Sequence, residues 1–176
     1  LDEIDKWIEV EEEVGEVAVY TETTSLDPHQ ADLVGISLCS KIGKACYIPV
    51  GHKSPKCLKK ETVIKKLKKI LEDPSIKKIG QNIKFDFIVL YKCGITLSSM
   101  EDTMLMSYVL DAGKNRHNMD TLSEIHLGHK TISFKDMVGT GKKEINFSEV
   151  ELDKAKDYAA EDPMLLLDYT RNLSKI

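Results

Sequence analysis

The sequence lacks the features that mark several other classes of protein. No stretch approaches the roughly 18 uncharged apolar residues that span a bilayer, and the acidic opening Leu1-Asp2-Glu3 has no basic region of the kind found in signal peptides. The four cysteines have no CxxC spacing and no histidine pair at zinc-finger distance: Cys39, Cys46, Cys57 and Cys93. We therefore expect reduced thiols in a soluble, cytoplasmic protein that makes no contact with a membrane.

An excess of basic residues is also absent, since the formal net charge is −4. A protein that binds nucleic acid over its whole surface normally carries more Lys and Arg than Asp and Glu. The net charge argues against this class of protein. A local basic site stays open. A lysine-rich stretch forms either a DNA-facing strip or a solvated helix face, and we favour the solvated face: Lys56, Lys59, Lys60, Lys65, Lys66, Lys68 and Lys69.

Length and composition fit one compact domain. The 176 residues, 41% hydrophobic and 31% charged, are enough to enclose a core. The chain opens without a methionine and closes on Ser174-Lys175-Ile176 without an obvious tail. We interpret residues 1–176 as a single domain excised from a longer protein, and we expect it to be monomeric.

Hydrophobic periodicity divides the chain into two parts. The first part predicts a helix near residues 4–10 and then three neighbouring strands at 16–21, 33–39 and 45–50, which suggest an antiparallel meander. The second part alternates a short strand with helices, as in a βαβ unit. Its predicted elements are helices at 60–71, 85–92, 102–110, 120–127 and 152–173 and a strand at 76–79. This order predicts an α/β fold with a mixed sheet covered by helices.

Acidic and phenolic side chains recur at three places that the hydrophobic pattern does not explain. Tyr20 and Glu22 end the first strand and point to the same face, because strand side chains alternate. Asp86 follows Asn82 where a strand passes into a helix, a common position for ligand-binding residues in α/β folds. Tyr158 and Asp162 are four residues apart and share one helix face. Taken singly, each acid is better explained as a surface residue.

Asp102 is a different case, because an acid that opens a helix beside Thr103 has the pattern of an N-cap. We predict a cap at Asp102 and leave it out of the metal-ligand set.

The three acidic places, in this order and spacing, resemble the three exonuclease motifs of the proofreading 3′–5′ exonuclease domain of family-A DNA polymerases, which include bacterial DNA polymerase I. That family carries Asp-x-Glu-Thr, Asn-x-x-x-Asp and Tyr-x-x-x-Asp, and is of the DEDD type with tyrosine in the third motif. The sequence between the motifs also resembles that of the family, in Lys78-Ile79-Gly80-Gln81-Asn82 and in residues 102–110. The resemblance covers nearly the whole chain.

The resemblance implies a ribonuclease-H-like exonuclease fold, with a mixed sheet of about five strands flanked by helices. Ribonuclease D is an alternative relative, because it shares Tyr-x-x-x-Asp. Residues 102–110 and 23–27 favour the polymerase over ribonuclease D.

The resemblance also implies a mechanism with two divalent cations, Mg²⁺ or Mn²⁺, about 3.5–4 Å apart. Their ligands here would be Glu22, Asp86 and Asp162, and Tyr158 would orient the attacking water. The implied partners are the single-stranded 3′ end of DNA and a polymerase domain of the same chain.

Further residues match positions that contact the nucleic acid in the family: Thr23, Leu26, Gln81, Asn82, Phe85, Arg116 and Phe134. Apolar and aromatic contacts would suit a site that accepts any base. Without the resemblance, core packing would be the better interpretation of Leu26, Phe85 and Phe134.

The chain departs from the family pattern at Tyr20, which occupies the position of the first-motif aspartate. A tyrosine offers one weak neutral oxygen where the family has a bridging carboxylate, so we expect zero or one metal ion. Three explanations remain open: a natural relic without activity, a ring that swings out and leaves a reduced site, or a deliberate substitution. We favour the relic. The function is then an exonuclease that is inactive or strongly impaired, or a structural or weak DNA-binding module within the polymerase.

Overall fold

A computed structural model describes residues 2–173 of the chain and contains a five-stranded sheet with helices on both faces. The strands are β1 (Glu16–Thr23), β2 (Leu33–Lys41), β3 (Lys44–Pro49), β4 (Lys77–Gly80) and β5 (Met100–Asp102). The helices are α1 (Asp2–Val14), α2 (Lys60–Leu71), α3 (Ile83–Lys92), α4 (Thr103–Asp111), α5 (Met119–Leu127), α6 (Phe134–Val138) and α7 (Leu152–Leu173), with 3₁₀ turns η1 (Gly141–Lys143) and η2 (Phe147–Glu149).

The sheet has the order β3-β2-β1-β4-β5. The first three strands pair antiparallel, and β4 and β5 add to β1 in parallel. The predicted mixed α/β sheet is therefore confirmed. The sequence did not predict β5 or α6, because three and five residues are too short for a hydrophobic period to show.

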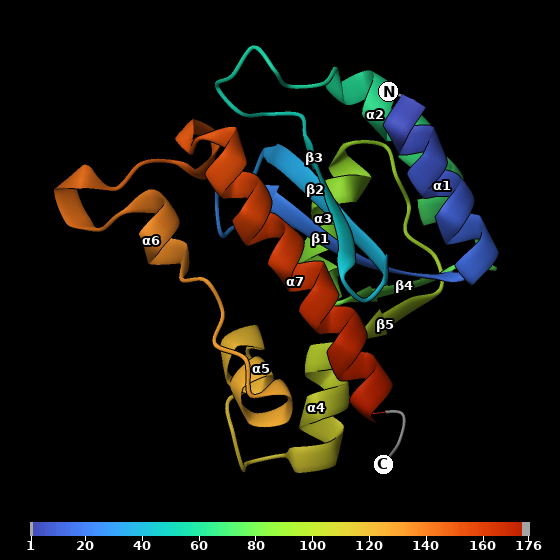
Figure 1. Cartoon of the computed structure of the whole chain (residues 1–176), viewed down its shortest axis with the longest axis vertical. Helices are drawn as coiled ribbons and strands as arrows, with labels where there is room; N and C mark the ends of the chain where they lie inside the picture. Colours follow the sequence, from blue (N-terminus) through green and yellow to red (C-terminus); the bar gives the residue numbers. More distant parts are fainter. Residues whose placement is uncertain (1, 174–176) are drawn as a thin grey trace.

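The two faces of the sheet pack against different helices. Val17 and Val19 of β1 join the core cluster that includes α1, α2 and α3. Ala18 points the other way and packs with Leu166 and Leu167 of α7. Figure 1 shows α7 running across this second face, while α1 and α2 lie together at one side of the sheet. By strand alternation, the residues two and four positions after Ala18 also lie on the α7 face.

The lysine-rich helix α2 lies against α1. Val63, Leu67 and Ile70 form its buried face. On its other side, Lys66 Nζ contacts Asp5 and Lys69 Nζ lies 2.7 Å from Glu12 Oε1, both in α1. These lysines thus face solvent and the acidic helix α1, which supports a solvated face over a DNA-facing strip.

None of the helices among residues 2–173 is long and apolar enough to cross a membrane. All four cysteines are free thiols.

One acidic residue of α1 is buried, although the sequence predicted only a helix end there. The side chain of Glu11 is fully buried, and among residues 2–173 neither of its carboxylate oxygens has a hydrogen-bond partner. Burial raises the pKa of Glu11 from 4.5 to about 7, and Ser40 and Lys41 nearby oppose the shift only in part. A buried carboxyl without partners favours its neutral form, since burial penalises the charged form.

We predict that Glu11→Gln stabilises the domain at alkaline pH and not at acidic pH. The folded-state pKa is raised, so the stability present below the unfolded value of 4.5 is lost as the pH rises to about 7. Gln mimics the neutral acid and should increase the free energy of unfolding by about 2 kcal/mol at about pH 8, with no gain at about pH 4. Urea unfolding at the two pH values measures this. The exposed Glu12 provides the comparison. If Glu12→Gln and Glu11→Gln changed the free energy of unfolding equally, the prediction would be contradicted.

Candidate active site

Tyr20 lies among the acidic and phenolic groups that the sequence singled out. It is the second residue after Ala18 on the α7 face of β1, and its ring packs against the cluster of Ala18, Cys39 and Leu166. Burial raises the pKa of Tyr20 well above 10, and the neighbouring groups raise it further, in the order Asp162, Glu22, Tyr158 and Asp86. The structure therefore brings the residues of all three motifs to one place, with Tyr20 among them.

Glu22 is buried at the end of the same strand. Burial raises its pKa well above 4.5, and Asp162 and Asp86 act in the same direction. In the part of the chain that the structure describes, its Oε1 atom is buried without a hydrogen-bond partner. A buried carboxylate oxygen without a donor, next to two other acids, is an arrangement that a cation would satisfy.

Asp86 reaches the site from the first turn of α3, but its carboxylate is already engaged. Its Oδ1 atom accepts hydrogen bonds from Thr21 N at 2.8 Å and from Thr21 Oγ1 at 2.7 Å. Among residues 2–173, β4 pairs with Glu16, Val17 and Ala18 of β1, and farther along β1 the backbone N–H of Thr21 donates to Asp86 instead of to a strand. Burial raises the pKa of Asp86 to about 7, against the lowering effect of both Thr21 hydrogen bonds.

Tyr158 and Asp162 come from α7, one helical turn apart. Asp162 is buried, and burial raises its pKa to about 7, with Glu161, Asp120 and Asp86 acting in the same direction. Burial also raises the pKa of Tyr158 well above 10, and the carboxylates of Asp162 and Glu22 raise it further. The Tyr158 hydroxyl therefore stays protonated at any physiological pH and can act only as a neutral hydrogen-bonding group.

The donor chemistry suits a hard cation, but the geometry does not gather a complete set of ligands. Carboxylate oxygens are the ligands that Mg²⁺ prefers. Among residues 2–173, however, no three His, Cys, Asp or Glu side chains converge on one point as a metal site requires. Asp86 is turned toward Thr21, whereas Glu22 keeps an oxygen without a partner. The residues present thus fit partial metal ligation through Glu22 and Asp162.

The turn that carries Asn82 is held by Asp102. Asn82 adopts a left-handed backbone conformation, with φ of 55°. Asp102 Oδ1 accepts from Asn82 N and from Met104 N, and Oδ2 accepts from Ile83 N, at distances of 2.9 to 3.0 Å. One carboxylate therefore caps α3 and α4 together. The predicted cap is confirmed, and it also fixes the strand-to-helix turn of the second motif.

The residues expected to contact nucleic acid differ in their exposure. Leu26 is 94% exposed, Arg116 is exposed, and Phe134 is 43% exposed. Phe85 is partly buried against the main core. The remaining three are tied into the fold: Thr23 Oγ1 donates to Ser25 O, Gln81 Nε2 donates to His117 O, and Asn82 is held at its backbone by Asp102.

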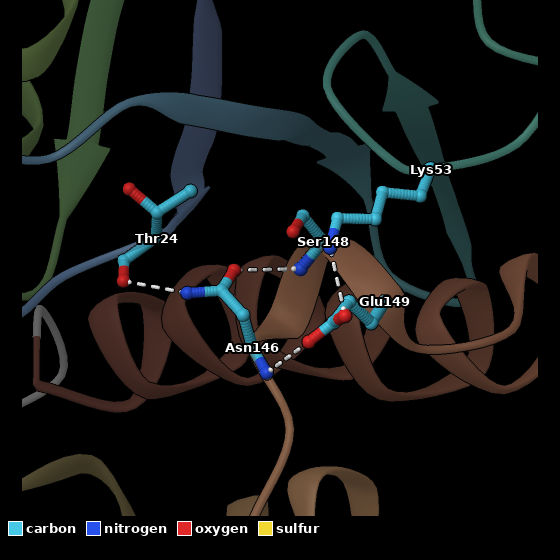
Figure 2. A network of polar contacts seen from close by, with 5 residues as sticks. All are labelled: Thr24, Lys53, Asn146, Ser148 and Glu149. Atoms are coloured by element: carbon cyan, nitrogen blue, oxygen red, sulfur yellow. Dashed lines mark hydrogen bonds and ion pairs between the residues drawn. The ribbon is translucent and has the colours of Figure 1, made fainter.

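A polar network joins the end of β1 to the segment before α7. Asn146 Nδ2 donates to Thr24 O at 2.9 Å, and Asn146 Oδ1 accepts from Ser148 N at 3.0 Å. Glu149 Oε2 accepts from Asn146 N, and Glu149 Oε1 pairs with Lys53 Nζ at 2.8 Å (Figure 2). The network therefore ties three segments that are distant in sequence.

Phe147, next to Asn146, brings an aromatic cluster to the third motif. The centroid of its ring lies 5.8 Å from that of Tyr158 and 5.6 Å from that of His52. It also stacks on Phe134, with the ring centroids 6.0 Å apart. His52 Nε2 lies 2.6 Å from Tyr47 Oη, and its Nδ1 lies 3.2 Å from Val150 O. Within this cluster, the rings of Phe134 and Phe147 pack against the ring of Tyr158. Sequence reasoning missed Phe147, His52 and Tyr47, because no local pattern links residues 47–52 to residue 147.

The chain matches known exonucleases and polymerases in sequence. The family of 3′-5′ exonucleases found in type A DNA polymerases matches residues 1–176. This chain is 43% identical to DNA polymerase I of Rhizobium leguminosarum over 180 residues, and 43% identical to DNA polymerase I of Pseudomonas aeruginosa over 164 residues. Each match covers 90% of this chain and 18% of the relative. The chain thus spans less than a fifth of the length of these relatives.

Solved structures share the fold at low sequence identity. Escherichia coli RNase D has a TM-score of 0.76 at 21% identity, covering 99% of this chain and 42% of that one. Brucella melitensis NrnC with bound Mg²⁺ has a TM-score of 0.73 at 24% identity, covering 94% of this chain and 74% of that one. These likenesses confirm the ribonuclease-H-like exonuclease fold. The family match, over residues 1–176, shows that the chain belongs to the 3′-5′ exonuclease domain family of family-A DNA polymerases.

Proposed function

We propose that this chain is the proofreading exonuclease domain of a DNA polymerase I, and that Tyr20 strongly impairs or abolishes its hydrolysis of DNA 3′ ends. The observation that carries the proposal is the position of Tyr20. Its ring packs on the α7 face of β1, close enough to Glu22, Asp86, Tyr158 and Asp162 for these groups to raise its pKa, and the family pattern implies an aspartate at this position. A partly buried neutral phenol there removes a ligand and also fills space.

The other residues keep the roles that the family pattern implies. Glu22 and Asp162 would hold one divalent cation, while Asp86 stays engaged by Thr21. Such a cation, when bound, lowers the pKa of water and neutralises charge on the phosphate. Tyr158, held by Phe147, would position the attacking water through its neutral hydroxyl.

The proposed substrate is single-stranded DNA, because the sequence relatives are DNA polymerases. Exposed Leu26 and half-exposed Phe134 would contact the terminal bases, and Arg116 would contact a phosphate. Thr23, Gln81, Asn82 and Phe85 would shape the same channel from the ends of β1 and β4 and the start of α3. The likeness to RNase D concerns the fold alone and does not favour RNA.

We expect the site to take up at most one divalent ion. Three carboxylates and a neutral phenol cannot balance the charge of two cations, and Asp86 is engaged by Thr21. Crystals soaked in millimolar Mn²⁺, examined by anomalous scattering, would locate any bound ion. Two ions about 4 Å apart, as in two-metal nucleases, would contradict the expectation.

We expect weak binding of single-stranded DNA, with a Kd no tighter than about 1 µM at physiological salt. The chain carries a net charge of −4, and the candidate channel offers Arg116 as its one proposed phosphate contact. Fluorescence anisotropy with a 5′-labelled oligonucleotide measures the Kd at several salt concentrations. Arg116→Ala should weaken binding and lower the salt slope by about 1. A nanomolar affinity that is independent of salt would refute this expectation.

A nuclease assay tests the proposed function directly. The chain is incubated with a 5′-labelled DNA primer that carries a mismatched 3′ end, in Mg²⁺ or Mn²⁺. We expect shortening at less than about one-thousandth of the rate of the Tyr20→Asp variant. Fast shortening by the unaltered chain that Asp162→Ala abolishes would show that Tyr20 does not impair the site. Shortening by neither protein would indicate a scaffold without turnover.

A further inference from the structure

Helix α4 is inverted relative to an ordinary surface helix. Its buried side chains are the polar Thr103 and Ser107, one turn apart. Its outward side chains are apolar: Val109 is 80% exposed and Leu105 is 58% exposed, and Tyr108 and Leu110 are also exposed. A helix on a water-facing surface normally directs its apolar residues inward. Helix α4 therefore presents an apolar face that the described fold does not cover.

Hydrogen bonds hold α4 in this orientation. Thr103 Oγ1 donates to Gly80 O at 3.1 Å and to Gln81 Oε1 at 2.6 Å. Ser107 Oγ lies 2.8 Å from His117 Nδ1. Rotating the helix to bury Leu105 and Val109 would break these contacts and leave buried polar groups without partners, which costs free energy. The outward apolar face is thus built into the fold.

The exposed face of α4 borders a groove of about 860 Å³ between α3, β5 and α4. Its apolar walls include Phe87, Met100, Met104, Leu105 and Val109, and we call it the α3–α4 groove. All three residues of β5 line the groove, and β5 is an edge strand of the sheet. Sheet edges in natural proteins are usually covered or protected, and methionines are common on adaptable binding surfaces.

The groove is unsuited to nucleic acid. The charged residues that line it are Lys84, Glu101 and Asp102, so acids outnumber bases, and Asp102 already caps two helices. Phosphate binding requires an excess of cations. The groove therefore fits an apolar protein surface.

We infer that the α3–α4 groove is the surface on which the polymerase portion of the same polypeptide docks, an inference that rests on the proposed function. The sequence relatives are more than five times as long as this match, since it covers 18% of each. They are DNA polymerases, so the remaining length contains a domain joined to this one. Exposed apolar patches of this kind mark protein interfaces. The groove would anchor the exonuclease domain against its neighbour.

Methionine oxidation in the longer polypeptide that carries this chain tests the inference. Hydrogen peroxide labelling followed by mass spectrometry compares Met100 and Met104 in that polypeptide and in the chain alone. We expect about tenfold slower oxidation of both in the longer polypeptide. Met137 of α6 lies outside the groove and serves as the internal reference, with the same rate in both proteins.

A substitution gives the matched second measurement. Val109→Asp should leave the melting temperature of the chain alone unchanged, because Val109 is 80% exposed. In the longer polypeptide it should restore fast oxidation of Met100 and Met104. Ile42→Asp, at an exposed aliphatic residue in the turn between β2 and β3, should change neither.

Three results would overturn the inference. Equal oxidation of Met100 and Met104 in the two proteins would show that nothing covers the groove. Self-association of the chain alone that Val109→Asp abolishes, without protection in the longer polypeptide, would assign the groove to a second copy. A longer polypeptide that cannot extend a primed template would remove the proposed occupant. Loss of the proposed nuclease role alone would leave the oxidation pattern unchanged, so the two failures are distinguishable.

Discussion

The Tyr20→Asp variant is expected to remove nucleotides from a DNA 3′ end about 10³–10⁵-fold faster than the unaltered chain, equivalent to roughly 4–7 kcal/mol of transition-state stabilisation. The reason is that Glu22, Asp86, Asp162 and Tyr158 lie close enough to this position to raise the pKa of Tyr20. Under the proposed function, an Asp at residue 20 would supply the carboxylate ligand that the site lacks. It also removes a ring from the site. A 5′-labelled, mismatched primer in Mg²⁺ measures the rate.

Matched variants separate the effect of the added carboxylate from the effect of removing the tyrosine ring. Tyr20→Ala removes the ring without adding a carboxylate, and should recover little of the activity. Asp86→Ala in the Tyr20→Asp protein should abolish shortening again, which excludes a contaminating nuclease. If the Tyr20→Asp protein folds normally and still leaves the primer intact in both Mg²⁺ and Mn²⁺, the hydrogen bonds between Asp86 and Thr21 become the next barrier to examine.

Lys78→Met is expected to lower the free energy of unfolding by about 3–4 kcal/mol. Lys78 is fully buried in β4, and its Nζ donates to Asp73 O and Ile76 O, both at 2.6 Å, with Ser98 Oγ at 3.3 Å. Methionine fills most of the space and offers no donor. The carbonyl groups are part of the backbone and would stay in place without the ammonium group. Denaturant unfolding followed by circular dichroism measures the change.

Lys65→Met is the matched control, because Lys65 is an exposed residue of α2. Its effect should stay within about 0.5 kcal/mol, as for most surface substitutions. The stability lost in Lys78→Met should also affect the candidate active site, because β4 leads directly into the turn at Asn82. Equal stability of the two variants would show that the carbonyl groups find other donors, such as water.

Much of the architecture could be predicted from local pattern. The strands at 16–21, 33–39 and 45–50 and the long helix at 152–173 correspond to β1, β2, β3 and α7. Alternation along a strand placed Tyr20 and Glu22 on one face, and the four-residue spacing placed Tyr158 with Asp162. These predictions succeed because residue spacing sets the direction of a side chain once the element is known. The short β5 and α6 had no such spacing to reveal them.

The sequence by itself determined the fold class, the family and the cap at Asp102. Only the tertiary structure decided that Thr21 engages Asp86, that Glu11 and Lys78 are buried, and that α4 turns its apolar face outward. Thr21 and Asp86 are 65 residues apart in the sequence, and Thr103 of α4 is held by Gly80 and Gln81, 23 and 22 residues before it. Burial, hydrogen bonding and pKa are set by such neighbours, and a one-dimensional pattern contains the spacing of residues along the chain but not the identity of the groups packed against them.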